Sequence, residues 1–212
     1  MGYEYDVFIS YRSTYKKWVK EVFLPIFEES LNEEVAIFQE KVTIFLDKDG
    51  ITGGDNWNNR ILNALSKSKC LIPIVSYQYL NSYNCRKEFV IMHHRQIQLG
   101  LQTINNPKGI IIPFAIHDGE HFKKIITDIE FYDCTDYRIP ECGIEAFLKS
   151  NAFLELGRKM NNWAKAVAKS ILYVNNNNPW NPNWLNTEWI NLPVDDILPP
   201  LYQQKITQPI LD

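Results

Sequence analysis

Several features that mark other functional classes are missing from this sequence of 212 residues. Its 22 lysine and arginine residues do not outnumber its 25 aspartate and glutamate residues, so a net charge of -3 offers no basic surface for nucleic acid. No apolar run approaches the ~20 residues that span a bilayer, and the first residues lack the basic and apolar parts of a signal peptide. We therefore expect a cytoplasmic protein that binds neither nucleic acid nor a membrane.

Cysteine is also scarce, and its spacing matches no zinc or redox pattern. The four cysteines are Cys70, Cys85, Cys134 and Cys142. We expect buried, reduced thiols; Cys85 as a nucleophile is the weaker alternative, because no base stands near it in the sequence. The aspartates of residues 47–56 lack the alternating ligands and the closing glutamate of a calcium loop. No metal site is predicted.

Apolar segments with the period of strands alternate along the chain with segments that have the period of helices. The expected strands are residues 5–10, 42–46, 70–76, 109–115 and, more weakly, 130–134; the expected helices are residues 15–31, 57–66 and 143–174, and one that carries Glu88 and ends near residue 99. Pro25 predicts a kink or break in the first helix. This alternation predicts an α/β fold, a parallel sheet with helices on both faces.

The composition changes near residue 175, where asparagine, proline and tryptophan become frequent. We expect one domain over residues 1–174 and an extension over residues 175–212. Its prolines exclude a regular helix, while its aromatic and aliphatic residues predict that it packs back on the domain.

Glu88 is the residue most indicative of chemistry. The strand before it, residues 70–76, is continuously apolar, as expected when helices cover both faces. Ligands of open α/β sheets collect at the carboxyl ends of the strands, and Glu88 follows such an end. Alternatively, Glu88 only stabilises the start of a helix electrostatically. His93 and His94, further along the same segment, are either acid–base partners or, more commonly, helix-surface residues.

Three motifs in order carry a family resemblance. They are Tyr5-Asp6-Val7-Phe8-Ile9-Ser10-Tyr11-Arg12; Phe45-Leu46-Asp47 with Gly54-Asp55-Asn56-Trp57; and Ile74-Val75-Ser76 with Tyr79, Ser82, Cys85 and Glu88. Over roughly residues 3–172 the chain resembles a TIR domain of the bacterial type. The resemblance implies a flavodoxin-like fold with five parallel strands in the order 2-1-3-4-5.

The resemblance also implies two possible activities. Some TIR domains are adaptors that assemble signalling complexes; others cleave NAD and release nicotinamide with ADP-ribose or a cyclised form of it. The catalytic glutamate of the cleaving class lies in the helix after the third strand, where this chain has Glu88. We expect an NAD glycohydrolase or ADP-ribosyl cyclase of bacterial antiphage defence, with NAD as substrate and no cofactor.

The same resemblance places further residues in the substrate site. They are Phe8, Ser10, Tyr11, Arg12, Asp47, Gly54, Trp57, Tyr83 and Asn84. Tyr11 would stack on a ring and Arg12 would meet a phosphate, whereas Phe8 is more readily explained as core. In the family, the loop over residues 47–57 gates the site and contacts a neighbouring protomer, which predicts self-association.

One position departs from the pattern of the cleaving class. Active members often have tryptophan four residues before the glutamate, where this chain has Asn84. Tyr83 is an aromatic neighbour, but on a helix it lies about 100° away. The departure favours the alternative, a non-catalytic adaptor. A third hypothesis, a nucleotide-binding signalling domain, lacks a glycine-rich loop after the first strand, where Ser10-Tyr11-Arg12-Ser13 stands. In each case a separate sensor or effector protein is a possible partner.

Overall fold

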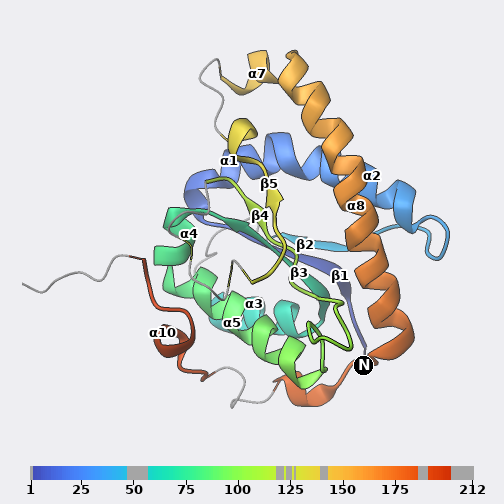
Figure 1. Ribbon diagram of the computed structural model, residues 1–212, viewed down its shortest axis with the longest axis vertical. Coiled ribbons are helices and arrows are strands. Elements are labelled where there is room, and N and C mark those ends of the chain that lie inside the picture. Colours follow the sequence, from blue (N-terminus) through green and yellow to red (C-terminus); the bar gives the residue numbers. More distant parts are fainter. Residues whose placement is uncertain are drawn as a thin grey trace, which may run out of the picture.

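The computed structural model describes residues 2–46, 57–117, 122, 126, 128–138, 143–185 and 191–201 (Figure 1). The strands are β1 (Tyr5–Ser10), β2 (Ile44–Leu46), β3 (Ser68–Val75), β4 (Phe114–Ala115) and β5 (Tyr132–Asp133). The longer helices are α2 (Leu24–Val35), α3 (Trp57–Ser66), α5 (Tyr83–Gln98) and α8 (Asn151–Asn177). The short helical segments are η1 (Ser13–Tyr15), α1 (Lys16–Trp18), η2 (Val19–Phe23), α4 (Tyr77–Asn81), η3 (Thr135–Tyr137), α7 (Ile144–Phe147), η4 (Pro182–Leu185) and α10 (Val194–Ile197).

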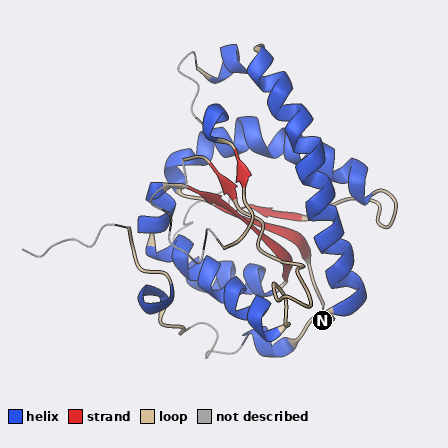
Figure 2. Ribbon diagram, viewed as in Figure 1, coloured by secondary structure: helices blue, strands red, loops and turns tan. Residues whose placement is uncertain are grey.

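The five strands form one sheet in the order β2-β1-β3-β4-β5, so the predicted fold and strand order are confirmed. Neighbouring strands pair in parallel throughout, with Ser10 at the end of β1 in register with Pro73 of β3. Helices cover the sheet on both sides (Figure 2). Because the strands are parallel, the carboxyl ends of β1, β3 and β4 meet at one edge, where the segments after each strand begin.

Alternation along the strands builds one core on each face of the sheet. On β1, Val7 and Ile9 join the core under α2 and α8, while Phe8 joins the core under α3 and α5. Both sets are buried, as expected for a parallel sheet between two helical layers. In β3 the same alternation divides Ile72 and Leu71 between the two cores.

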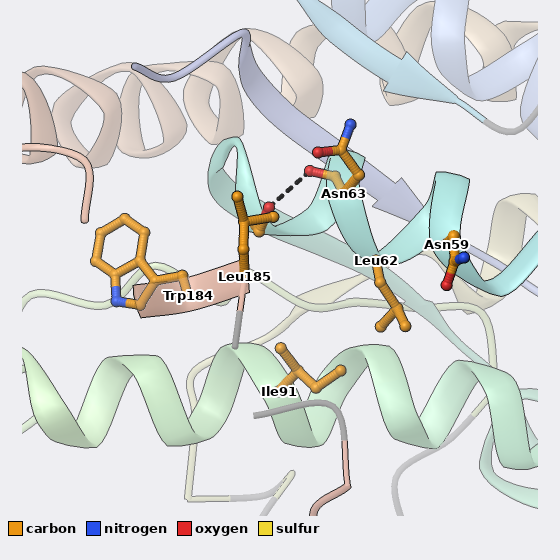
Figure 3. A pocket seen from close by; sticks show the side chains of 7 residues that line it. Asn59, Leu62, Asn63, Ile91, Trp184 and Leu185 are labelled. Carbon is orange, nitrogen blue, oxygen red and sulfur yellow. Dashed lines mark hydrogen bonds between the residues drawn. The ribbon is translucent and has the colours of Figure 1, made fainter. Parts of the chain in front are cut away.

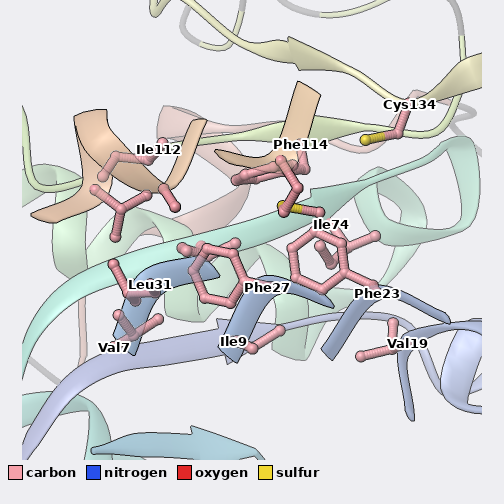
Figure 4. Close-up of a cluster of buried hydrophobic side chains, with 14 of the residues drawn as sticks. Val7, Ile9, Val19, Phe23, Phe27, Leu31, Ile74, Ile112, Phe114 and Cys134 are labelled. Carbon is pink, nitrogen blue, oxygen red and sulfur yellow. The ribbon is translucent and has the colours of Figure 1, made fainter. Parts of the chain in front are cut away.

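The first core combines aliphatic residues with a group of contacting phenylalanines (Figure 4). Phe23, Phe27 and Leu31 recur every four residues and present one buried helical stripe to the sheet. Phe114 of β4 meets Phe23 edge-to-face with ring centroids 5.0 Å apart. Truncation of such a buried phenylalanine to alanine typically costs about 3–5 kcal/mol.

The N-terminal edge of the sheet is tied together by Asp6. One carboxylate oxygen accepts from Lys69 Nζ at 2.6 Å, and the other accepts from the Thr43 backbone N–H and from Gln39 Nε2, each at 2.8 Å. Burial alone would raise the pKa of Asp6, but these hydrogen bonds outweigh it and leave the pKa below its usual value. Asp6 therefore links β1 to the residues at the starts of β2 and β3.

Some predicted element boundaries are wrong for identifiable reasons. The expected helix 15–31 begins with a 3-10 turn, η1, and then runs through α1, the π-helical η2 and α2 without leaving helical dihedrals. Pro25 lies in the first turn of α2, directly after the π-helical segment, so the kink or break predicted there takes the form of a change of helix type. The expected strand 109–115 shortens to Phe114–Ala115, with an isolated bridge at Ile111. Between them stands Pro113, which has no N–H to donate to the sheet.

The expected helix 143–174 is two helices. It is interrupted after α7, and Ser150 caps the start of α8 by accepting from the Phe153 N–H at 3.3 Å. A serine that satisfies a free N–H at a helix start favours a new helix over continuation of the old one. Helix α8 continues through Asn177, so the domain boundary predicted at residue 174 falls inside a helix.

The described part of residues 178–201 runs from the end of α8 past α3 and α5 to α10 (Figure 1). Segment η4 contacts α3, and α10 contacts α5. Trp184, Val194 and Leu198 are buried. No helix among the described residues is long and apolar enough to cross a membrane.

Candidate functional site

Glu88 lies in the second turn of α5, where its carboxylate reaches the edge of the sheet. The helix begins after Ser82, whose hydroxyl caps it. The Ser10 hydroxyl, at the end of β1, donates a hydrogen bond to Glu88 Oε2. The Glu88 side chain is buried, with an exposed fraction of 8%. Because the electrostatic effect of a helix end fades beyond the first turn, stabilisation of the helix start does not account for this carboxylate.

Tyr79 extends this contact into a chain of three side chains. Its hydroxyl lies 3.0 Å from Ser10 Oγ, and its side chain is fully buried. Ser10 has one hydroxyl proton and donates it to Glu88, so Tyr79 is the donor to Ser10. Burial, followed by the charges of Cys85 and Glu88, raises the pKa of Tyr79 well above its usual value. Tyr79 therefore stays a proton donor and fixes the orientation of Ser10.

Cys85 faces the same interior one helical turn before Glu88. Burial and the charge of Glu88 raise the pKa of the Cys85 thiol to about 12, while smaller effects, including the charge of Arg12, lower it. The thiol is therefore protonated near neutral pH and is a poor nucleophile. Cys70, Cys85 and Cys134 are buried and free, as predicted, whereas Cys142 lies outside the described residues.

The predicted site residues in and after β1 differ in burial. Arg12 is exposed, and its charge acts on Cys85, which places a cation near the start of α5. Tyr11 is half-buried and packs against the core under α2 and α8. Phe8 is 2% exposed and stacks on Phe45 with ring centroids 5.0 Å apart, so it contributes packing, which was the preferred explanation for this residue. The substrate contacts predicted for these residues stay predictions.

Tyr83 and Asn84 are exposed at the first two positions of α5. The Tyr83 side chain is 52% exposed. Of the remaining predicted site residues, Asp47 and Gly54 lie outside the described residues. Trp57 opens α3, but its side chain is not among those described. The predicted gate over residues 47–57 thus stays a prediction.

The structure adds His117, which the sequence analysis did not select. It follows β4 at the same edge of the sheet, and its ring stacks on Tyr77 with centroids 4.5 Å apart. Its Nδ1 accepts from the Tyr77 backbone N–H at 3.1 Å, so the neutral ring carries its proton on Nε2, 3.5 Å from the Tyr15 hydroxyl. A polar residue directly after an apolar strand was the available signal for His117. Tyr79 is noted above only as part of the third motif, because a buried tyrosine is also typical of core.

A pocket of about 170 Å³, which Glu88 does not line, lies between α3, α5 and η4 (Figure 3). It is lined by Asn59, Leu62, Asn63, Ser66, Ile91, Trp184 and Leu185. Typical small-molecule sites are larger, at about 300–1,000 Å³. The pocket marks the seam between the domain and the C-terminal extension, and contains none of the predicted site residues. Within the described ranges, no group of histidine, cysteine, aspartate and glutamate side chains is arranged to hold a metal ion.

The TIR domain family matches residues 7–148, about two thirds of the chain. This chain belongs to the TIR domain family. The matched segment contains Ser10, Tyr79 and Glu88, so the three linked side chains all lie within the family match. The latter part of the chain, with α8, η4 and α10, lies beyond it.

Comparison with other proteins adds little about activity. No curated protein matches the chain. Among solved structures, the chain is similar to the TIR domains of the activated Roq1 resistosome that directly recognises the pathogen effector XopQ. The identity is 18% and the TM-score 0.37, over 92% of this chain and 99% of that chain. The assignment to TIR domains rests on the family match, and the fold on the strand order described above.

Proposed function

We propose that this TIR domain cleaves the bond between nicotinamide and ribose in NAD, with Glu88 as the catalytic carboxylate. The observation that carries the proposal is the buried Glu88 carboxylate, held by Ser10 at the carboxyl edge of the parallel sheet. A buried carboxylate is expensive unless it is hydrogen-bonded. Retaining one at the edge where ligands bind α/β sheets is more typical of a site than of packing.

The chemistry of NAD requires little more than one positioned carboxylate. Nicotinamide leaves NAD as a neutral molecule from a cationic linkage, so its departure needs no general acid, unlike the two-carboxylate hydrolysis of ordinary glycosides. As the bond breaks, positive charge develops on the ribose. The Glu88 carboxylate would stabilise that charge and bind the ribose hydroxyls, while the hydrogen bond from Ser10 fixes its orientation.

Arg12 and Tyr11 would bind the rest of the substrate. Arg12 is exposed and close enough to the start of α5 to lower the pKa of Cys85, a smaller effect than those of burial and Glu88. That position suits a cation that meets the pyrophosphate. Attack by water on the ribosyl cation gives ADP-ribose, and attack by a group of the adenine end gives a cyclic product. Because the chain resembles bacterial TIR domains, we propose that the reaction serves antiphage defence.

The test is chromatography of NAD incubated with concentrated protein, with nicotinamide, ADP-ribose and cyclic products quantified. Glu88→Gln keeps an oxygen that accepts from Ser10, so it should fold and yet release no nicotinamide. Glu145→Gln, which changes an exposed glutamate of α7, is the matched control and should be as active as the wild type. Release that survives in Glu88→Gln, or that is absent from the wild type at every concentration, would contradict the proposal.

The alternative is a TIR adaptor that assembles signalling complexes without catalysis. Asn84 favours it, because cleaving members of the family often have tryptophan at that position, and the exposed Tyr83 beside it suits a contact with another protein. An adaptor would associate with other TIR domains and leave NAD intact. Both functions predict association, so sedimentation over a concentration series identifies the concentration at which the protein is associated, and the NAD assay at that concentration distinguishes the two functions.

A further inference from the structure

Two buried arginines of α5 donate hydrogen bonds through their Nη atoms to groups outside the helix. Arg86, 4% exposed, donates through Nη1 to the Asp195 carboxylate and, at 2.8 Å, to the Leu198 carbonyl. Arg95 is fully buried and donates through Nη1 to the Ser68 carbonyl at 2.8 Å. A buried cation needs such partners, because its desolvation is otherwise uncompensated.

The partners of both arginines include the C-terminal extension. Trp184 of η4 lies over the Arg95 guanidinium, with its ring centroid 4.2 Å from Cζ. Asp195 and Leu198 belong to the segment of α10. The extension therefore contacts the helix of Glu88 at two separate places, past the end of the TIR family match at residue 148.

Apolar contacts hold the α10 segment against the domain. Val194 is 3% exposed and Leu198 fully buried, and both belong to the core cluster under α3 and α5, which also contains Phe89 and Val90. By contrast, the Asp195 side chain is 65% exposed. Replacement of Asp195 therefore removes the charge partner of Arg86 while the buried contacts of the segment remain.

Arg86 and Glu88 lie on opposite sides of α5. Two residues along an α-helix correspond to a rotation of about 200°. Glu88 points to Ser10 at the sheet edge, and Arg86 points away from it, to Asp195. The first turns of α5 are thus bound on one side to the sheet, through Ser10 and Glu88, and on the other side to the C-terminal extension, through Arg86 and Asp195.

We propose that Asp195 is a positioning residue for Glu88, acting through Arg86 on the first turns of α5. This inference rests on the proposed function for its effect on catalysis. The contact itself is independent of that function. When Asp195 is removed, Arg86 keeps only a carbonyl partner for a buried charge, so its side chain and the helix around it shift toward water. Small displacements of a reacting group suffice to slow a reaction strongly.

The experiment compares Asp195→Ala with Asp196→Ala in the full chain. Asp196 is the exposed neighbour on the same helix, and among the described residues it makes no ion pair. Hydrogen exchange of the amides of residues 84–90 should accelerate in Asp195→Ala and not in Asp196→Ala. Asp195→Glu restores a carboxylate and should restore protection.

The kinetic readout separates positioning from substrate binding. For Asp195→Ala we expect kcat for nicotinamide release to fall by about 5- to 100-fold with KM unchanged, and Asp195→Glu to recover most of it. If wild-type protein leaves NAD intact, the proposed function fails, and exchange at residues 84–90 decides the positioning contact alone. Unchanged exchange in Asp195→Ala, or an equal change in Asp196→Ala, would overturn the inference.

Discussion

The Ser10 hydroxyl donates a hydrogen bond to the Glu88 carboxylate across a sequence separation of 78 residues. One residue ends β1, and the other lies in the second turn of α5. The contact places a buried carboxylate at the edge of the sheet where β1 and β3 end, and it is the geometric basis for the proposed NAD cleavage.

Removal of the Ser10 hydroxyl should slow the reaction without unfolding the protein. In Ser10→Ala the carboxylate loses a hydrogen bond of a kind worth about 1.5–3 kcal/mol, so we expect kcat for nicotinamide release to fall about 10- to 100-fold. Ser13→Ala, which removes an exposed hydroxyl of the same loop region, is the control and should retain full activity. Equal kcat values for Ser10→Ala and the wild type would show that this contact has no catalytic role.

Tyr79→Phe tests the second link of the chain. It removes the hydroxyl that donates to Ser10 but leaves the Ser10 contact with Glu88 in place. We expect a smaller loss of kcat than in Ser10→Ala and a loss of stability of about 1 kcal/mol, measured by urea unfolding. A loss of activity larger than that of Ser10→Ala would mean that Tyr79 acts on the substrate directly.

The lowered pKa of Asp6 predicts that part of the free energy of unfolding is lost in acid. Its pKa is lowered in the folded protein, because the hydrogen bonds of the carboxylate outweigh the cost of burial. A lowered pKa stabilises the fold at pH above the unfolded value of about 3.9, and this contribution disappears as the pH falls through the folded pKa. Asp6→Asn should thus be less stable than the wild type at pH 7, with a difference that shrinks below about pH 4.

The matched control for Asp6 is Glu4→Gln, at the same edge of the sheet. Glu4 pairs with Lys67 at 2.5 Å, but its side chain is 52% exposed, and exposed pairs contribute little. We expect the free energy of unfolding of Glu4→Gln to stay within about 0.5 kcal/mol of the wild type at about pH 7 and at about pH 3. A difference for Asp6→Asn that persists at pH 3 would indicate packing instead of charge.

Asn84→Trp tests whether the departure from the pattern of cleaving TIR domains matters. Asn84 is exposed, so the substitution should leave stability within about 0.5 kcal/mol. We expect faster nicotinamide release or a changed ratio of cyclic to linear product, because an indole offers a stacking surface near Glu88. Asn81→Trp, at an exposed position of α4, should do neither. Identical kinetics for all three proteins would mean that position 84 does not contact the substrate.

Self-association should appear as a dependence of activity on protein concentration. If a neighbouring protomer completes the site, specific activity rises with concentration until the associated state is fully populated. Measurement of nicotinamide release per milligram over a hundredfold dilution tests this. Constant specific activity down to the most dilute sample would show that one chain contains the complete site.

Much of the architecture followed from the sequence. The continuous apolar run of residues 70–76 identified a strand covered on both faces, and the order of strands and helices identified a parallel sheet. Local chemistry was also readable where it is short-range, as with Pro25, where the helix changes from π to α. The interruption before α8 was missed. The cap formed by Ser150 favours a new helix start over helix continuation by only a small free energy, which the apolar pattern of the sequence does not reveal.

The sequence by itself determined the fold class, the family resemblance and the place of Glu88 after a buried strand, since all three depend on spacing along the chain. Only the tertiary structure decided which groups surround that carboxylate. Tyr79 reaches Ser10 across 69 residues, and Asp195 reaches Arg86 across 109 residues. Contacts over such separations depend on how complete elements pack, and no local periodicity encodes them.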